Sequence, residues 1–300
     1  MDKKCYHGEA AIKVFIDVNK NLDILNVVKE IHKLSYQIHL GGMAAQFIER
    51  SFNGLIDQCE SEEKLHCYFK SRREDFVRLN LEQKLASYKV KSLFRTMFMV
   101  PAELFEGIVV DIGAGNNSFG KAVVEKCSKV TKVVGVDIDD INVYKNDKLE
   151  FIKSEDKNKV NLPGDYADVV IFRFSLHHMG RDTQKKLLTE AYRILKKRGS
   201  LIIVEDTFSV IKASIFDNEL LDKFMKLGSN EKYIKAISYM DASSCFLYKE
   251  VMPFTFEFRC MEDWEEIILD CGYKNIDSRF WGIPFSSLFQ APLGIIRGVK

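Results

Sequence analysis

The stretch VVDIGAGNNSFG, residues 109–120, contains the features that decide the fold predicted for this sequence. Its apolar start is typical of a buried strand, and Gly113 and Gly115 form a glycine-rich turn before residues that suit a helix. Because glycine has no Cβ, its backbone adopts positive φ angles freely and lets a ligand approach closely. In a doubly wound sheet, such a turn lies at the carboxyl end of the first strand, where ligands bind. The stretch therefore predicts a strand, a ligand-binding loop and a helix, in that order.

The loop departs from two phosphate-binding patterns. The dinucleotide fingerprint G-x-G-x-x-G/A needs glycine or alanine where this sequence has Ser118, and Gly120 comes two residues too late. The pattern G-x-x-x-x-G-K-[ST] fits Gly115, Gly120 and Lys121. However, Ala122 then replaces the hydroxyl residue that would hold Mg²⁺. Both patterns are therefore disfavoured.

Apolar runs and helical segments alternate along the chain from Pro101 onward. Continuous apolar strands that alternate with helices are typical of a parallel sheet covered on both faces. The expected strands of this part are 107–113, 130–136, 149–153, 167–172 and 201–204. The expected helices are 120–127, part of 138–147, 182–195, about 209–240 and 261–271, and the later strand-like segments are 254–258, 275–281 and 294–299.

An acidic residue, Asp137, ends the second expected strand, 24 residues after Gly113. A carboxylate in this place can accept hydrogen bonds from both hydroxyls of an adenosine ribose. The alternative is that Asp137 only caps the end of the strand. The glycine loop upstream favours the ribose interpretation, because the two features together form one nucleoside-binding pattern.

Three motifs in order resemble those of the class I S-adenosylmethionine-dependent methyltransferases. They are D-x-G-x-G at 111–115, the acid Asp137, and F-S-L-H-H at 174–178 after the fourth strand. The resemblance covers residues 105–206 well and 250–300 more loosely. It implies an α/β fold with a doubly wound, seven-stranded sheet, mostly parallel with the last strand antiparallel, and S-adenosyl-L-methionine as the cofactor.

The resemblance also implies which residues bind the cofactor. Asp111 would lie near the methionine amino group, Asp137 on the ribose and Ile138 against the adenine. The acid that reaches the adenine amino group is Glu155 by alignment or Asp156 by residue type, and both stay open. The set that we expect is Asp111, Gly113, Ala114, Gly115, Asn116, Asp137, Ile138, Glu155, Asp156 and Arg173.

Few residues are candidates for the chemistry. A hydroxyl or ammonium acceptor needs a base, and histidine suits this role near neutral pH. His177 and His178 follow the fourth strand and Glu205 ends the fifth, so these three are the catalytic candidates. The alternatives are that a histidine caps the next helix or bonds to backbone, and that Glu205 holds a substrate cation. Arg173 has two open interpretations, as the binding group for an anion or as an ion-paired surface residue. No metal site is expected, because the remaining histidines show no ligand spacing.

Residues 1–100 have apolar residues mostly at helical spacing, and we expect a helical N-terminal region there. Residues 101–300 are expected to form a Rossmann-like methyltransferase domain with a helical insertion at about 207–250. In the family such additions commonly cover the active site and select the substrate. Aromatic side chains in them would suit an apolar small molecule, although ordinary helix packing also explains them. These aromatic residues are Tyr36, Phe47, Phe52, Tyr233, Tyr239, Phe246 and Tyr248.

Composition narrows the choice of acceptor. The net charge is +1, from 44 Lys and Arg against 43 Asp and Glu, which argues against a protein that mainly holds nucleic acid. The 7 cysteines contain no C-x-x-C pair, and neither a signal peptide nor a membrane-spanning run is visible. We therefore expect a cytoplasmic enzyme that methylates O, N or C of a small-molecule acceptor, with a homodimer left open. The alternatives are a methyltransferase for RNA or protein, or a homologue that binds the cofactor without methylating.

Overall fold

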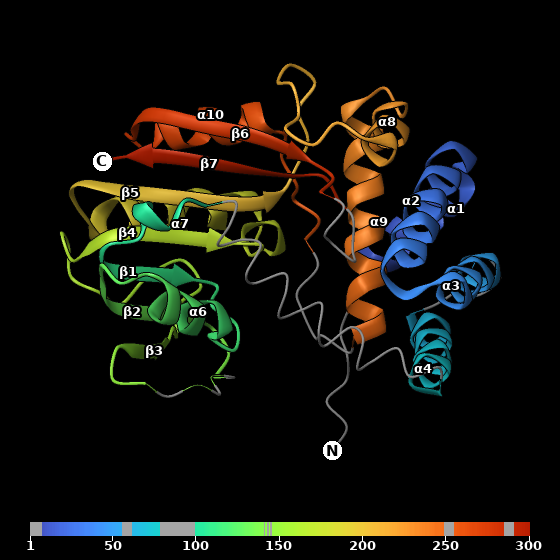
Figure 1. The fold of residues 1–300 in the computed structure, drawn as a ribbon, viewed down its shortest axis with the longest axis horizontal. Coiled ribbons are helices and arrows are strands. Elements are labelled where there is room, and N and C mark those ends of the chain that lie inside the picture. The colour runs from blue at the N-terminus through green and yellow to red at the C-terminus, as the bar shows by residue number, and fades with distance from the viewer. Residues whose placement is uncertain are drawn as a thin grey trace. The chain divides into compact units, whose positions relative to one another are not determined.

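The computed structural model describes residues 8–55, 62–78, 100–140, 142, 144, 146–248, 255–284 and 291–300. The chain divides into two compact units. The sheet unit contains residues 91–213, 259–280 and 293–300, and the helical unit contains residues 1–90, 214–258 and 281–292. Figure 1 shows the elements of both units.

The sheet has seven strands, and its order confirms the predicted fold class. Strands β1, β2, β3, β4 and β5 pair in parallel, and β7 is antiparallel to β5 (Figure 1). In spatial order the strands are β3 (Leu149–Lys153), β2 (Val130–Asp137), β1 (Gly107–Ile112), β4 (Ala167–Arg173), β5 (Leu195–Asp206), β7 (Leu293–Val299) and β6 (Lys274–Gly282).

The strand order reverses between β1 and β4. From β1 the chain proceeds outward to β2 and β3, and it then returns to place β4 on the other side of β1. In the register, Asp111 of β1 lies between Gly135 of β2 and Ile171 of β4. In doubly wound sheets, ligands bind at the carboxyl ends of the strands at such a switch point. The glycine loop, Asp137 and the segment after β4 all begin at this edge.

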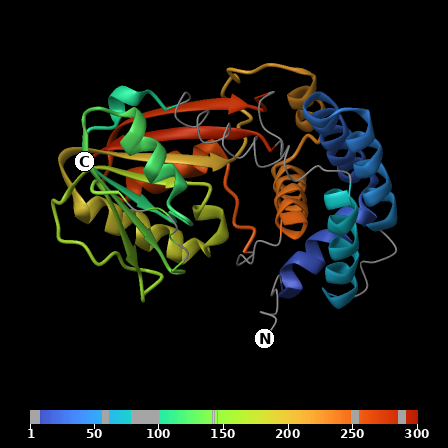
Figure 2. The ribbon, with the colours of Figure 1, turned by 60° about the horizontal axis from the view of Figure 1, so that its bottom comes forward.

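Helices cover both faces of the sheet. Figure 2 shows α6 (Ser118–Lys126) on one face and α7 (Arg181–Ile194) with α10 (Met261–Asp270) on the other. The strands are accordingly buried in continuous runs, such as 109–112 in β1 and 169–172 in β4. Each fully buried aliphatic side chain of this kind contributes roughly 1.5–3 kcal/mol relative to an exposed one.

The helical unit has an aromatic and aliphatic core of its own. The Phe15 ring contacts Tyr239 edge-on, with centroids 4.9 Å apart, and Phe224 stacks on Tyr233 at 5.1 Å. Phe47, Tyr233 and Tyr239 are buried, whereas the side chains of Tyr36, Phe52, Phe246 and Tyr248 lie outside the described residues. The helices of this unit are α1 (Gly8–Lys20), α2 (Leu22–Leu40), α3 (Gly42–Leu55), α4 (Glu62–Arg78), α8 (Glu219–Met225) and α9 (Asn230–Tyr248). The expected domain boundary at residue 100 follows a stretch outside the described residues and stays a prediction.

Two expected elements are wrong. The described residues of 138–147 form no helix, because a side-chain turn at Asn142 and another at Asn146 engage the backbone locally. The expected strand at 254–258 is irregular over 255–258. Phe256 there has a φ of 51°, which a strand does not permit.

Candidate functional site

The glycine loop is tied to β2 by its backbone. The N–H groups of Gly113 and Ala114 both donate to the carbonyl of Val136, at 2.8 and 3.1 Å. A Cβ at Gly113 would lie 2.5 Å from the Cβ of Ser175, so glycine is required there. A Cβ at Gly115, whose φ is 55°, would meet nothing within 4 Å. The loop therefore packs closely at Gly113 and faces open space at Gly115.

Asp137 lies beside this loop. Its Oδ2 accepts the Gly115 N–H at 2.8 Å, and its Oδ1 accepts the Asp139 N–H at 3.2 Å. A carboxylate oxygen has two acceptor directions, so Asp137 can still accept two hydroxyl groups. The next residue, Ile138, is 47% exposed although it is apolar. Asn116 is exposed and accepts the Ser118 N–H at 3.1 Å, which closes a local turn.

The two acids after β3 differ in their hydrogen bonds. The Ser154 N–H donates to the Asp137 carbonyl at 2.7 Å, so this loop begins beside the end of β2. Asp156 accepts the Asn158 N–H at 2.8 Å in a local turn. Glu155 is exposed and makes no hydrogen bond with the part of the chain that the structure describes. Glu155 is thus the more available of the two carboxylates.

Asp111, at the end of β1, is a buried carboxylate. It is 2% exposed, and it makes no hydrogen bond among the described residues. Burial raises its pKa from 3.8 to about 7, while the positive charge of Arg173 acts in the opposite direction. An unbonded carboxylate in this position lacks donors that a ligand can supply.

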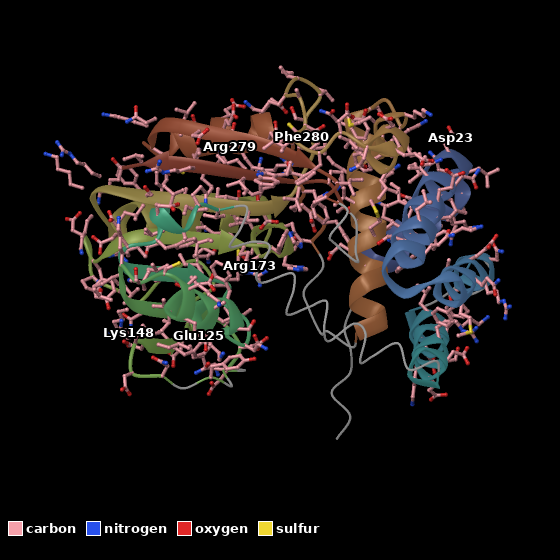
Figure 3. The ribbon with its side chains drawn as sticks, in the orientation of Figure 1. Asp23, Glu125, Lys148, Arg173, Arg279 and Phe280 are labelled. Carbon is pink, nitrogen blue, oxygen red and sulfur yellow. The ribbon has the colours of Figure 1, made fainter. Side chains whose placement is uncertain are left out.

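Arg173 is the cationic counterpart at the end of β4 (Figure 3). Its guanidinium lies over the rings of Phe119 and Phe174, at 5.2 and 5.5 Å from their centroids. Burial lowers its pKa, and the charges of Asp111 and Glu205 raise it. Within the described residues it forms neither a hydrogen bond nor an ion pair at contact distance. Arg173 and Asp111 therefore place opposite charges near each other with their hydrogen-bonding capacity unused.

Glu205, at the end of β5, holds the turn that follows β4. Its Oε1 accepts the N–H groups of Ser175 and Leu176 at 2.8 and 2.7 Å. Its Oε2 is 2.5 Å from His177 Nδ1. The carboxylate is fully buried, and three donors engage its two oxygens. The His178 ring lies against His177, with centroids 4.1 Å apart.

A second group holds the same turn from α7. Gln184 Nε2 donates to the carbonyls of Leu176 and Met179 at 3.0 and 3.1 Å. Arg259 Nε in turn donates to Gln184 Oε1 at 2.7 Å. Sequence reasoning missed Gln184 and Arg259. The available signal was a polar residue in the apolar stripe of α7, because Gln184 shares its helical face with Leu187.

The structure thus gathers the predicted site residues at one edge of the sheet. Four neighbouring strands carry Asp111, Asp137, Arg173 and Glu205 at or one residue before their carboxyl ends. The glycine loop follows β1, and residues 174–178, the histidine turn, follow β4. The roles expected for these residues stay predictions at this point. What the arrangement offers is an acid for a cation, a guanidinium for an anion, and backbone that a nucleoside can approach.

Residues 110–203 match the family described as "Methyltransferase domain". This span runs from β1 to β5 and includes the glycine loop, Asp137 and the histidine turn. This part of the chain is a methyltransferase domain of the class I S-adenosylmethionine-dependent type. Its cofactor is S-adenosylmethionine, as the motifs predict. No curated protein matches the sequence of this methyltransferase.

Solved structures of methyltransferases resemble the chain distantly. A methyltransferase from Thermotoga maritima, described as a possible histamine N-methyltransferase, has 18% identity and a TM-score of 0.49, covering 75% of this chain and 97% of that one. Human N-acetylserotonin methyltransferase in complex with S-adenosylmethionine has 14% identity and a TM-score of 0.49, with 90% and 70% covered. A methyltransferase from Archaeoglobus fulgidus has 16% identity and a TM-score of 0.47, with 70% and 93% covered.

Proposed function

We propose that this methyltransferase transfers the methyl group of S-adenosylmethionine to O, N or C of a small-molecule acceptor in the cytoplasm. The observation that carries the cofactor site is the charged pair of Asp111 and Arg173, together with the glycine loop that leaves open space at Gly115. The near-zero net charge supports a small acceptor, because proteins that hold nucleic acid usually show a basic excess. In the described residues, no helix has both the length and the apolar character needed to cross a membrane.

The charged pair fits the amino-acid part of the cofactor. A methionine group carries an ammonium and a carboxylate on one carbon. Asp111 would accept hydrogen bonds from the ammonium, and the Arg173 guanidinium would donate to the carboxylate, in charge-assisted contacts. Arg173 points towards Phe119 of α6, the helix that follows the glycine loop, which favours the cofactor over the acceptor as the source of this carboxylate.

The remaining cofactor contacts follow from the strand ends. Asp137 would accept the ribose hydroxyls, and the exposed Ile138 would pack on the adenine. Glu155 would reach the adenine amino group, because its exposed carboxylate takes no part in a local turn, whereas Asp156 is held by the Asn158 N–H. Asp156 keeps acceptor capacity and is the alternative. Gly115 leaves the space that the ligand needs. When bound, the cofactor supplies a methyl group on a sulfonium, ready for in-line displacement.

The histidine turn supplies the proton acceptor if the substrate needs one. Because His177 Nδ1 faces the Glu205 carboxylate, the neutral ring carries its proton on Nδ1 and leaves Nε2 as the acceptor. Glu205 is then a positioning residue, since its two oxygens already serve the turn and the imidazole. His178, stacked on His177, is the second candidate base. The helical regions 1–100 and 207–250 would select the acceptor.

The proposal is tested first by binding and transfer. Calorimetry with S-adenosylmethionine and S-adenosylhomocysteine should show binding of both. Labelled-methyl transfer in a cell extract should then place the label in the small-molecule fraction. Label found only in RNA or protein would overturn the acceptor class, and binding without any transfer would indicate the non-methylating alternative.

The Glu205→Gln variant tests the histidine turn once an acceptor is known. Glutamine Oε1 can still accept the Ser175 and Leu176 N–H groups, but its NH₂ would donate to His177 Nδ1 and move the ring proton to Nε2. We expect kcat to fall while the affinity for S-adenosylhomocysteine and the unfolding temperature change little. An unchanged kcat would remove His177 Nε2 from the chemistry.

A further inference from the structure

Asn117 has an unusual place directly after the glycine loop. Its backbone is left-handed, with φ 63° and ψ 20°, and its side chain is fully buried. Among residues with a side chain, asparagine adopts this conformation most readily. It precedes α6, yet its side chain does not cap the helix. Instead its Nδ2 donates to the Glu150 carbonyl of β3, at 3.3 Å.

Two glycines make room for this amide. A Cβ at Gly135 of β2 would lie 2.6, 2.8 and 3.0 Å from Oδ1, Cγ and Nδ2 of Asn117, and these are the three nearest atoms. A Cβ at Gly120 of α6 would also meet Asn117 Oδ1. The amide therefore fills a slot between α6 and β2 that exists only because both facing residues lack a side chain.

The slot determines the geometry of the loop. The Asn117 N–H donates to the Ala114 carbonyl at 2.9 Å, which closes the turn around Gly115. Its carbonyl accepts the Lys121 N–H at 3.1 Å, which starts α6. Asn117 is thus fixed to β3 by its side chain and to the loop and the helix by its backbone. The loop contains Gly113 and Gly115, and without these attachments its glycines would leave it free to sample many conformations.

The chemistry of the slot argues against simple core filling. Asn117 Oδ1 is buried and has no hydrogen-bond partner in the described part of the chain. An apolar side chain would fill the slot without burying an unpaired acceptor, but its backbone would disfavour the left-handed conformation. The need for a left-handed backbone at residue 117 therefore explains why asparagine is present there despite its unpaired oxygen.

We propose that Asn117 is a positioning residue that locks the glycine loop in the conformation that binds the cofactor. This inference rests on the proposed cofactor site. The lock holds the Gly115 N–H against Asp137 before the ligand arrives, so less conformational freedom is lost on binding. Gly135 and Gly120 contribute to this role because they leave the space that the amide occupies.

The experiment is a double-mutant cycle between Asn117→Gly and Gly135→Ala, read by calorimetry of S-adenosylhomocysteine binding at a temperature well below unfolding. Glycine at 117 permits the left-handed backbone and removes the side chain with its amide. We expect each single variant to bind at least tenfold more weakly than the wild type. In the Asn117→Gly background, the added methyl of Gly135→Ala should have no further effect, because the atoms it would meet are gone.

Gly120→Ala is the matched control. Its Cβ would also lie 2.9 Å from Leu149 Cδ1 and 3.0 Å from Val133 Cγ1, so Asn117→Gly should not rescue it. A second readout is hydrogen exchange in the unliganded protein, where Asn117→Gly should accelerate exchange of the Gly115 N–H and leave the amides of β4 unchanged. This readout requires only the Asn117→Gly variant to fold.

The outcomes separate this inference from the proposed function. A wild-type protein that does not bind S-adenosylhomocysteine would overturn the cofactor site itself. Wild-type binding with unchanged affinity and unchanged exchange in Asn117→Gly would overturn only the lock, even if the unfolding temperature falls. An equal effect of Gly135→Ala in both backgrounds would show that the methyl acts on something other than the amide.

Discussion

The two ends of β4 carry charged side chains in opposite circumstances. At the amino end, Asp168 accepts the Ile108 N–H at 2.8 Å, and Lys196 Nζ lies 2.9 and 2.8 Å from its two oxygens. At the carboxyl end, the Arg173 guanidinium lies over two aromatic rings and forms no hydrogen bond among the described residues, and neither does the nearby, buried Asp111. Asp168 at the amino end of β4 thus has hydrogen-bond partners, whereas Arg173 at the other end and the neighbouring Asp111 of β1 have none among the described residues.

The rest of the amino edge follows the pattern of Asp168. Lys300 Nζ contacts Asp165 at 2.9 Å and the Leu195 carbonyl at 2.6 Å. Arg193 bonds to Glu190, which also accepts a backbone N–H. Paired charges of this kind contribute modestly to stability. The groups at the carboxyl edge that lack such partners among the described residues instead cost stability, which fits the proposal that a ligand pairs with them.

The largest effect is expected for Asp111→Asn. The change removes the charge-assisted contact to the cofactor ammonium, worth about 1.5–3 kcal/mol, so S-adenosylhomocysteine should bind roughly 10- to 150-fold more weakly. The unliganded protein should keep or gain stability, because a buried carboxylate disappears. Calorimetry gives the first quantity, and denaturant unfolding gives the second.

The control for this variant is 5′-methylthioadenosine, a ligand without the amino-acid group. Asp111→Asn should leave its affinity unchanged, because the nucleoside contacts of Asp137 and Gly115 remain. An equal loss of affinity for both ligands would mean that the substitution disturbs the loop rather than the ammonium contact.

Arg173→Met should have the next largest effect. Methionine keeps an apolar chain against Phe119 and Phe174, so the loss is confined to the carboxylate contact. We expect roughly tenfold weaker binding of S-adenosylhomocysteine, unchanged binding of 5′-methylthioadenosine, and partial recovery in Arg173→Lys. If the cofactor binds normally but KM for the acceptor rises, the guanidinium serves an anionic group of the acceptor instead.

The pH dependence of binding should report Asp111. Its pKa of about 7 lies above the ordinary 3.8, so the folded, unliganded protein holds a proton that the unfolded chain has released. The stability that this proton contributes is present below pH 4 and declines as the pH rises to about 7. Binding of the ammonium needs the ionised carboxylate, so affinity should increase up to about pH 7 and then level off. Calorimetry from pH 5.5 to 8 measures this trend, and Asp111→Asn should abolish it.

Sequence alone predicted the parts of the site that depend on local backbone. The glycine loop and Asp137 follow from residue types that allow a tight turn and end a strand. The hydrogen bonds of Glu205 to the histidine turn were not predictable, because they join separate strands of the sheet. The slot around Asn117 was missed for the same reason, since Gly135 acquires its meaning only when α6 packs on β2. Gln184 was predictable in part, because a lone polar residue in the apolar stripe of a helix indicates a buried hydrogen-bond partner.

The smallest effect is expected for Asp168→Asn, which tests the amino edge. Asparagine Oδ1 can still accept the Ile108 N–H, so only the attraction to Lys196 is lost. Both side chains are partly exposed, so the free energy of unfolding should fall by less than about 1 kcal/mol, and less at high salt. S-adenosylhomocysteine should bind as it does to the wild type. A loss of affinity comparable to that of Asp111→Asn would contradict the comparison between the two edges. It would show that an ion-paired residue at the amino end of β4 also affects ligand binding.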